Sequence, residues 1–447
     1  MSMRTGWIFL IISSLIVVGY ALQRDIRYDR AYPGDLRNRV VGARMIEDGK
    51  SPYFYKWKKG DPIRYYDPTN FDSFRVAVIT SSPFLHHMLV PLVNRPEVQV
   101  SKIWLAVEYL LLISMTALAY SLAKSAPGKM AVVLLSLLFL LTNAWKKHTS
   151  LGQTYICIPF FALLFFFFFR KNKQLAYAPV AGAAAACLVL IRINTIFFFI
   201  PFLFLFRQYS RSWLLAFFIP VFLLAGWTLA NRQERGLWLD YGKAIADYTD
   251  ISQGHPAIQY NEPGPQFNNW EGVDMKAAAV VEKNEPDKIY SENGNFFVIV
   301  KAVTHYMIPA PVLGVAALSI ICGLLLVFCA RYFRRRSVPP PGLEKTAIFG
   351  FCLYMITDLF SPVYRHQYYT VQWLFPLLIA AAILSPRSSL KWPYLIIAGS
   401  LLLSCVHLGF LKMQNTIAEY LIMASLLVIS LFPEPSSRQE STPASLS

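Results

Sequence analysis

The sequence predicts an all-α polytopic membrane protein. Of its 447 residues, 55% are hydrophobic and 15% are aromatic, and the mean hydropathy is +0.41. Soluble domains usually contain about 45 to 50% apolar residues. The apolar residues also form long runs, and a helix of roughly 17 to 25 such residues crosses the ~30 Å hydrocarbon core of a bilayer.

The apolar runs predict about twelve transmembrane helices. They lie near residues 6–22, 99–123, 129–145, 153–169, 174–191, 193–206, 212–230, 307–330, 346–361, 369–384, 392–410 and 414–432. The first run has one arginine before it and no small-residue cleavage site after it. This pattern favours a membrane anchor over a removable signal peptide.

Basic residues in the links between runs predict the orientation, because they favour the cytoplasmic side. Five short links are basic, and together they outweigh residues 23–75, which are also rich in lysine and arginine. The five links carry Lys124 and Lys129, then Arg170, Lys171 and Lys173, then Arg207 and Arg211, then Arg331, Arg334, Arg335 and Arg336, and finally Arg387 and Lys391. The N-terminus is then cytoplasmic, provided that residues 76–93 do not cross the membrane.

This orientation divides the chain into six segments. Residues 1–22 form the first transmembrane helix, and residues 23–98 form an exported loop with amphipathic and half-inserted helices. Residues 99–230 and 307–432 form the other transmembrane helices, and residues 231–306 form a second exported loop. Residues 433–447 are rich in serine and proline, which predicts a disordered cytoplasmic tail.

Charge and cysteine content exclude some classes of site. The net charge of +16 fits the orientation signal and contact with anionic membrane lipid, and we expect no nucleic acid partner. All six cysteines lie in or beside apolar runs, so neither a disulfide framework nor a zinc site is predicted. Asp67 and Asp72 could hold a divalent cation, but their turn-like surroundings favour solvated side chains.

The first exported loop begins with "YPGDLRNRVVGARMIEDGKSPYFY", residues 32–55, which predicts an amphipathic helix on the outer membrane surface. Asp35 lies at its start, where a carboxylate can cap free N–H groups, and Gly49 follows its end. One face is apolar, with Leu36, Val40 and Ala43, and the other faces water, with Arg37, Arg44 and Glu47. Taken alone, Asp35 is best explained as a simple N-cap.

Several motifs occur in the order found in a known family. "DGKSPYFY" follows the amphipathic helix, and further along come "SSPFLHHMLVPL", "LGQTYICIPFFALL", "AGAAAACLVLIRINTIFFFIPFLFLFR" and "FSPVYRHQYYTVQWLFPLL". Over most of residues 7–385 the chain resembles the GT-C glycosyltransferases of family 87. It departs from the family pattern at Ser82, at Arg192, where lysine is usual, at Gln367, where a second histidine is common, and around Asn295. The sugar and the acceptor are therefore left open.

The resemblance implies a GT-C fold with two exported loops that carry interfacial helices. It implies inverting transfer of a hexose, with mannose the first candidate, from a polyprenyl-phosphate sugar to a glycan or glycolipid acceptor. The protein would lie in the inner (plasma) membrane with its active site on the periplasmic or extracellular side. It would require no cofactor, and no metal ligands are assigned.

The chemistry of such a transfer explains the candidate residues. The leaving polyprenyl phosphate departs without a proton but gains negative charge, so the enzyme needs one base and several cations. We expect Asp35 to be the general base and His366 the second catalytic residue. The predicted substrate-binding residues are Arg39, Lys147, Gln153, Arg192, Tyr364 and Arg365. The alternatives for Arg192 and Lys147 are snorkelling to the interface and anchoring there.

The second exported loop is expected to fold over the first as short helices and turns. Tyr260, Asn268, Asn269 and Trp270 would suit contact with a sugar acceptor, and ordinary packing explains them equally well. Two other functions remain open: a lipid-linked sugar flippase or transporter, and a protein of the O-antigen ligase or polymerase type. A transporter usually carries ionisable residues near the bilayer midplane.

Overall fold

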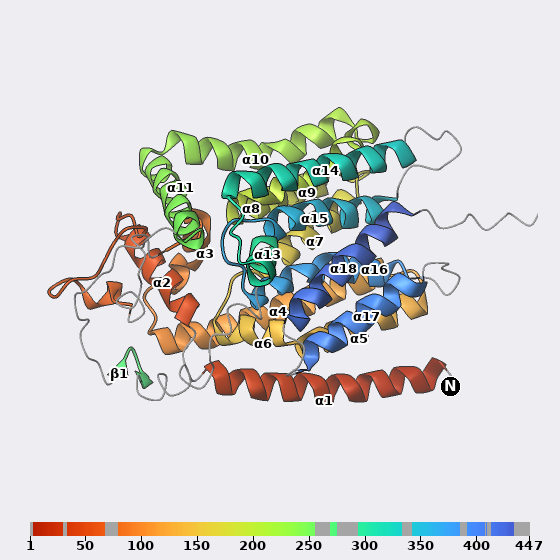
Figure 1. Ribbon diagram of the computed structural model, residues 1–447, viewed down its shortest axis with the longest axis horizontal. Coiled ribbons are helices and arrows are strands. Elements are labelled where there is room, and N and C mark those ends of the chain that lie inside the picture. Colours follow the sequence, from red (N-terminus) through yellow and green to blue (C-terminus); the bar gives the residue numbers. More distant parts are fainter. Residues whose placement is uncertain are drawn as a thin grey trace, which may run out of the picture.

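The computed structural model describes residues 3–29, 34–67, 79–254, 269–274, 294–332, 342–384, 391–406, 408 and 413–432. This part of the chain is helical except for one short hairpin, in which β1 (Asn269–Trp270) pairs antiparallel with β2 (Val273–Asp274). The predicted all-α class is confirmed. The N-terminal end of the first helix lies at the opposite end of the molecule from α2, α3, α11 and the hairpin (Figure 1).

The helix bundle contains most of the predicted apolar runs. Its helices are α1 (Met3–Asp29), α4 (Glu97–Leu122), α5 (Ala126–Leu140), α6 (Asn143–Ser150), α7 (Cys157–Phe169), α8 (Ala178–Ile191), α9 (Ile196–Leu203), α10 (Arg211–Ala230), α14 (Ala310–Tyr332), α15 (Leu343–Leu359), α16 (Leu374–Ala382), α17 (Lys391–Cys405) and α18 (Gln414–Leu431). A short helix, α13 (Phe296–Thr304), precedes α14, and a 3-10 segment, η7 (Gln367–Trp373), precedes α16.

The expected number of about twelve crossings is not confirmed. Among the described residues, five helices are long and apolar enough to span a bilayer, namely α1, α4, α10, α14 and α18. The pair α5 and α6 makes a sixth span if it is counted as one helix bent by 59°. Other runs are divided into shorter helices, as in α9, which has 8 residues and contains Pro201.

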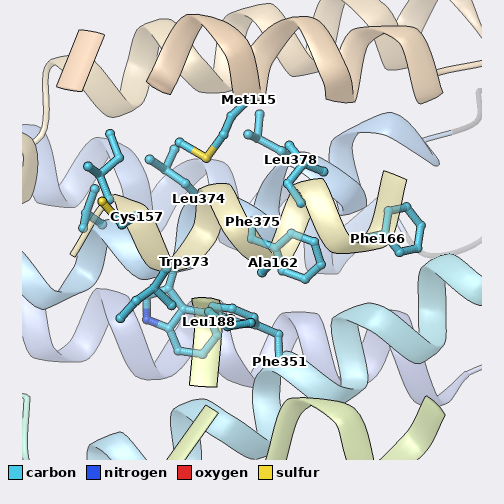
Figure 2. Close-up of a cluster of buried hydrophobic side chains, with 14 of the residues drawn as sticks. Met115, Cys157, Ala162, Phe166, Leu188, Phe351, Trp373, Leu374, Phe375 and Leu378 are labelled. Atoms are coloured by element: carbon cyan, nitrogen blue, oxygen red, sulfur yellow. The ribbon is translucent and has the colours of Figure 1, made fainter. Parts of the chain in front are cut away.

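The core of the bundle lies around α7. Figure 2 shows its centre, where side chains of α7, including Ala162 and Phe166, meet Leu374, Phe375 and Leu378 of α16. Helices approach closely where glycine removes the side chain, since a Cβ at Gly182 of α8 would collide with the backbone of α10. Small residues commonly allow such close contacts between membrane helices.

Three helices of the segments that are predicted to be exported pack on one another at one end of the bundle (Figure 1). They are α2 (Gly34–Glu47), α3 (Pro83–Leu89) and α11 (Arg232–Ser252). A buried cluster joins Ile46 of α2 and Tyr53 to Leu237 and Ala244 of α11. The segment that contains α11 thus packs on the segment that contains α2, and α11 is one helix of 21 residues and not the expected set of short ones.

The predicted placement of α2 on the membrane surface is wrong in one respect. Its basic face is enclosed by protein, since Arg37 and Arg44 are each 2% exposed. Arg37 pairs with Asp67 at 2.8 Å, and Arg44 pairs with Glu271, next to the hairpin turn, at 2.7 Å. Asp67 is likewise buried and not solvated. The burial of these arginines is tolerated because each is paired with an acid.

The apolar face of α2 also contacts protein. Leu36, Val40 and Ala43 belong to the main core cluster together with Leu85 of α3. The end of the helix is as predicted, since Gly49 has φ +72° and its N–H binds the carbonyl of Ile46. At the other exported segment, Tyr260 and Asn268 lie outside the described residues, and so do the side chains of Asn269 and Trp270.

Candidate functional site

A cavity of about 460 Å³ lies between the exported helices and the ends of the bundle helices. Arg39 of α2 lines it on one side, and Arg192, which directly follows α8, lines it on another. Tyr155 and Tyr369 contribute aromatic rings to its wall. Helix α11 contributes one face, made of Trp238, Tyr241, Gly242, Ile245, Tyr248 and Thr249.

Gln153 connects Asp35 to this cavity. Its side-chain amide donates a hydrogen bond to Asp35, and its amide oxygen accepts one from Arg39 at 2.6 Å. Gln153 is fully buried and Asp35 is half-buried. Asp35 lies in the first turn of α2, outside the lining of the cavity, and the backbone N–H of Leu36 ties this turn to the carbonyl of Leu151 at 3.1 Å.

The turn that carries Gln153 is held by a buried pair. His148 Nδ1 lies 2.9 Å from Glu108 Oε1, and His148 Nε2 accepts the backbone N–H of Ile156 at 3.2 Å. Because Nε2 is an acceptor, the proton of the neutral imidazole lies on Nδ1, the nitrogen next to Glu108. Trp104 further donates to the carbonyl of Gln153 at 3.1 Å. The sequence analysis missed Glu108, although an acid inside an apolar run is a signal of function or pairing.

Arg192 lies against two aromatic rings of the cavity wall. Its guanidinium carbon is 5.5 Å from the ring centre of Tyr155 and 5.2 Å from that of Tyr369. Nη2 donates to Asp358 of α15, whereas Nη1 is buried with no hydrogen-bond partner among the described residues. The side chain is 18% exposed and lines the cavity.

Three predicted residues of the segment after α15 lie in different surroundings, and none is in the cavity lining. Arg365 is 1% exposed and is bound by Asp358 and Glu419. His366 is half-buried and its ring stacks on Tyr368 at 5.3 Å between centres. Tyr364 packs on the ring of Phe297 at 5.7 Å.

The predicted residues fall into two sets. Arg39 and Arg192 line one cavity, and Asp35 is joined to Arg39 through Gln153, outside the lining. Arg365 is joined to Arg192 through Asp358 and lies 5.4 Å from the ring centre of Tyr369, while Lys147 lies half-buried on α6 and is not part of the lining.

Two tyrosines near the site remain protonated at neutral pH. Burial raises the pKa of Tyr241 to about 12. Burial and, next, the Asp35 carboxylate raise the pKa of Tyr368. Both side chains therefore offer hydroxyl groups that can donate hydrogen bonds. No motif of the sequence indicates the α11 face that contains Tyr241, because its aromatic residues are dispersed among charged ones and meet only on the folded helix.

The described residues contain no group of three or more His, Cys, Asp or Glu side chains that could hold a metal ion. The adjacent histidines of α3 have separate partners. His86 Nδ1 binds the carbonyl of Arg39 at 3.0 Å, and His87 Nε2 binds Glu234 of α11 at 2.8 Å. They serve to connect α3 with α2 and with α11.

The fold and the site define an all-α membrane protein with an aromatic cavity that contains two arginines beside an acid. The family model of glycosyltransferase family 87 matches residues 80–262, a stretch that includes Gln153, Arg192 and α11. The chain thus resembles this family, as predicted. No curated protein matches it.

Two solved structures of archaeal proteins show a likeness at low identity. One is the oligosaccharyltransferase of Archaeoglobus fulgidus in the apo form, with 14% identity, a TM-score of 0.42, and coverage of 98% of this chain and 58% of that one. The other is the oligosaccharyltransferase AglB of Archaeoglobus fulgidus in complex with an inhibitory peptide and a dolichol-phosphate, with 13% identity, a TM-score of 0.39, and coverage of 95% and 56%. The chain therefore spans less than three fifths of either protein. The comparisons support a membrane glycosyltransferase.

Proposed function

We propose that the protein transfers a hexose, with mannose the first candidate, from a polyprenyl-phosphate sugar to a glycan or glycolipid acceptor. The transfer takes place on the periplasmic or extracellular face of the inner (plasma) membrane. One observation carries the proposal: Arg39 and Arg192 line the same cavity, and each has guanidinium nitrogens without a partner among the described residues. Buried N–H donors of this kind suit a phosphate group.

The two arginines fit the charge changes of the reaction. The donor phosphodiester carries one negative charge, and the polyprenyl phosphate gains a second as the glycosidic bond breaks. Donors that bind the second charge act late on the reaction path, which raises the rate more than tight binding of the substrate does. The rings of Tyr155 and Tyr369 hold Arg192 in the wall, where the phosphate would lie.

Asp35 is proposed as the general base. As the acceptor hydroxyl attacks the anomeric carbon, its proton passes to the Asp35 carboxylate, and a single displacement inverts that carbon. Gln153 orients the carboxylate from one side and binds Arg39 on the other, so base and phosphate site share one support. General-base catalysis typically contributes about 10²- to 10⁴-fold to the rate.

The aromatic face of α11 is proposed to bind the sugar ring. Trp238, Tyr241 and Tyr248 lie on the same side of this exported helix and line the cavity opposite Arg39 and Arg192. Ligand cavities generally combine aromatic walls with a few polar groups, and this arrangement suits a ring with one apolar face and several hydroxyl groups.

A transfer assay tests the proposal. Purified protein in vesicles is given radiolabelled polyprenyl-phosphate mannose and a membrane extract as the source of acceptor. Label in a product that no longer migrates with the donor supports a transferase. Label that crosses the bilayer while remaining on the donor overturns the proposal in favour of a flippase, and transfer only from a polyprenyl-diphosphate glycan overturns it in favour of a ligase.

A further inference from the structure

Four charged side chains of alternating sign form a row that starts at the cavity wall. Arg192, after α8, donates to Asp358 of α15. The other oxygen of Asp358 accepts from Arg365 Nε at 2.5 Å. Arg365 is in turn bound through Nη1 and Nη2 by the two oxygens of Glu419 on α18, at 2.6 and 2.5 Å. The row therefore connects the cavity wall to α18, a helix that does not line the cavity.

The three members beyond Arg192 are buried. Asp358, Arg365 and Glu419 are 0%, 1% and 2% exposed. Trp373 donates a further hydrogen bond to Glu419 at 2.6 Å, and a Cβ added at Gly294 would approach both Glu419 and Arg365 to 3.0 Å or less. Buried charges are tolerated when each is paired and hydrogen-bonded, and the removal of one partner is strongly unfavourable.

The row gives Arg192 a fixed orientation. A free arginine side chain has many rotamers, so an unsupported guanidinium would occupy many positions in the cavity. Asp358 binds Nη2, and the guanidinium lies against the neighbouring rings of Tyr155 and Tyr369, which leaves Nη1 as the nitrogen without a partner in the described part of the chain. Asp358 cannot turn away, because Arg365 holds its second oxygen.

We propose that Asp358 is a positioning residue that holds Arg192 for the phosphate of the lipid-linked donor, and that Arg365 and Glu419 hold Asp358 in turn. This inference rests on the proposed function for the identity of the ligand. It gives Arg365 a different task from the direct substrate contact expected from the sequence. It also assigns a role to two acids that belong to no motif of the sequence analysis.

A double-mutant cycle tests the inference. We expect Asp358→Asn to lower transfer by about 10- to 100-fold, and by no more than Arg192→Ala does, because a positioning residue acts through the group that it holds. In the Arg192→Ala background the same change should cost about threefold or less, since the group that it holds is gone. Glu419→Gln should also lower transfer, by a smaller factor, and this loss should likewise shrink in the Arg192→Ala background.

A matched control comes from the other end of α15, where Glu344 pairs with Arg170 at 3.3 Å. Glu344→Gln removes an ion pair from the same helix and should leave transfer unchanged. An equal loss from Asp358→Asn with and without Arg192 would mean a purely structural role and would overturn the inference. If Asp358→Asn does not yield monodisperse protein, the same criterion is applied to Glu419→Gln.

The outcome remains separable from that of the proposed function. If the wild-type protein transfers no label, the proposed function fails, and the cycle is measured instead as the dissociation constant for a short-chain polyprenyl phosphate. A change in that constant on Asp358→Asn that disappears in the Arg192→Ala background supports the positioning role. Equal changes in both backgrounds overturn it.

Discussion

The side-chain amide of Gln153 donates a hydrogen bond to the carboxylate of Asp35. The direction of this bond follows from the partner on the other side, because Arg39 can only donate and must therefore face the amide oxygen of Gln153. The amide nitrogen is left for Asp35, which as a carboxylate can only accept. The orientation of the proposed base thus depends on Arg39, which lies four residues, or about one helical turn, after Asp35 in α2.

This relationship makes Asp35→Asn a clean test of the base. Asparagine retains an oxygen that can accept from Gln153, and asparagine is tolerated as well as aspartate near a helix start. It lacks a group that can take up the acceptor proton. We expect transfer to fall by at least about 100-fold, while the thermal unfolding midpoint in detergent is unchanged.

Asp61→Asn is the matched control, because Asp61 lies in the same exported segment and binds Tyr55 and the backbone of Lys58. It should leave transfer as in the wild type. If Asp35→Asn transfers label at the wild-type rate, Asp35 is a helix cap and the base is another residue.

His366→Ala tests the second residue predicted to be catalytic. The His366 ring stacks on Tyr368, whose pKa is raised by burial and, next, by the Asp35 carboxylate. We expect transfer to fall by about 10- to 1,000-fold, the scale of losing one charge-stabilising donor. His87→Gln, which keeps a donor for Glu234, serves as the control and should have no such effect. Equal activity of both variants would remove His366 from the site.

The course of α2 could be predicted from the sequence, but its surroundings could not. The helix ends where Asp48 and Gly49 indicate, because the Gly49 conformation is a local property. Which face is exposed depends on distant residues. Arg44 is buried because Glu271, far away along the chain, neutralises it, and local periodicity contains no information on that contact.

The same limit applies to the candidate site. The sequence indicates Gln153 and Arg192 through motifs, and in the structure Arg192 lines the cavity while Gln153 binds the lining residue Arg39. The sequence also contains Asp358 and Glu419 inside apolar runs, and an acid in such a run indicates a functional or paired side chain. Their pairing through Arg365 joins helices α15 and α18, and only the packing of the bundle determines it.

The predicted orientation is tested by labelling single cysteines with a membrane-impermeant thiol reagent. We expect Gly60→Cys, in the first exported segment, to react in intact cells, because Gly60 is exposed. Lys173→Cys, in the basic link after α7, should react only after permeabilisation, since positive links stay in the cytoplasm. The wild-type chain gives the background from its six native cysteines. Reaction of Gly60→Cys only from inside would place the proposed site on the cytoplasmic face.

The contact between α2 and α3 predicts how stability depends on pH. His86 is fully buried, its ring lies 6.2 Å from that of Tyr53, and its Nδ1 binds the carbonyl of Arg39. Burial lowers the pKa of His86 to about 4 from an ordinary value of 6.5. Between these values the unfolded chain binds a proton that the folded protein does not bind, so the free energy of unfolding decreases as the pH falls from about 6.5 to about 4.

The shift corresponds to a loss of about 3 kcal/mol when the pH has fallen below both values. The unfolding midpoint measured by thermal scans in detergent should therefore decline over this window. His86→Asn places an amide donor near the position of Nδ1 but cannot be protonated, so the variant should be less stable at pH 7 and should show a shallower decline. The same slope in the variant and in the wild type would mean that His86 does not cause the pH dependence, and that other buried groups titrate in its place.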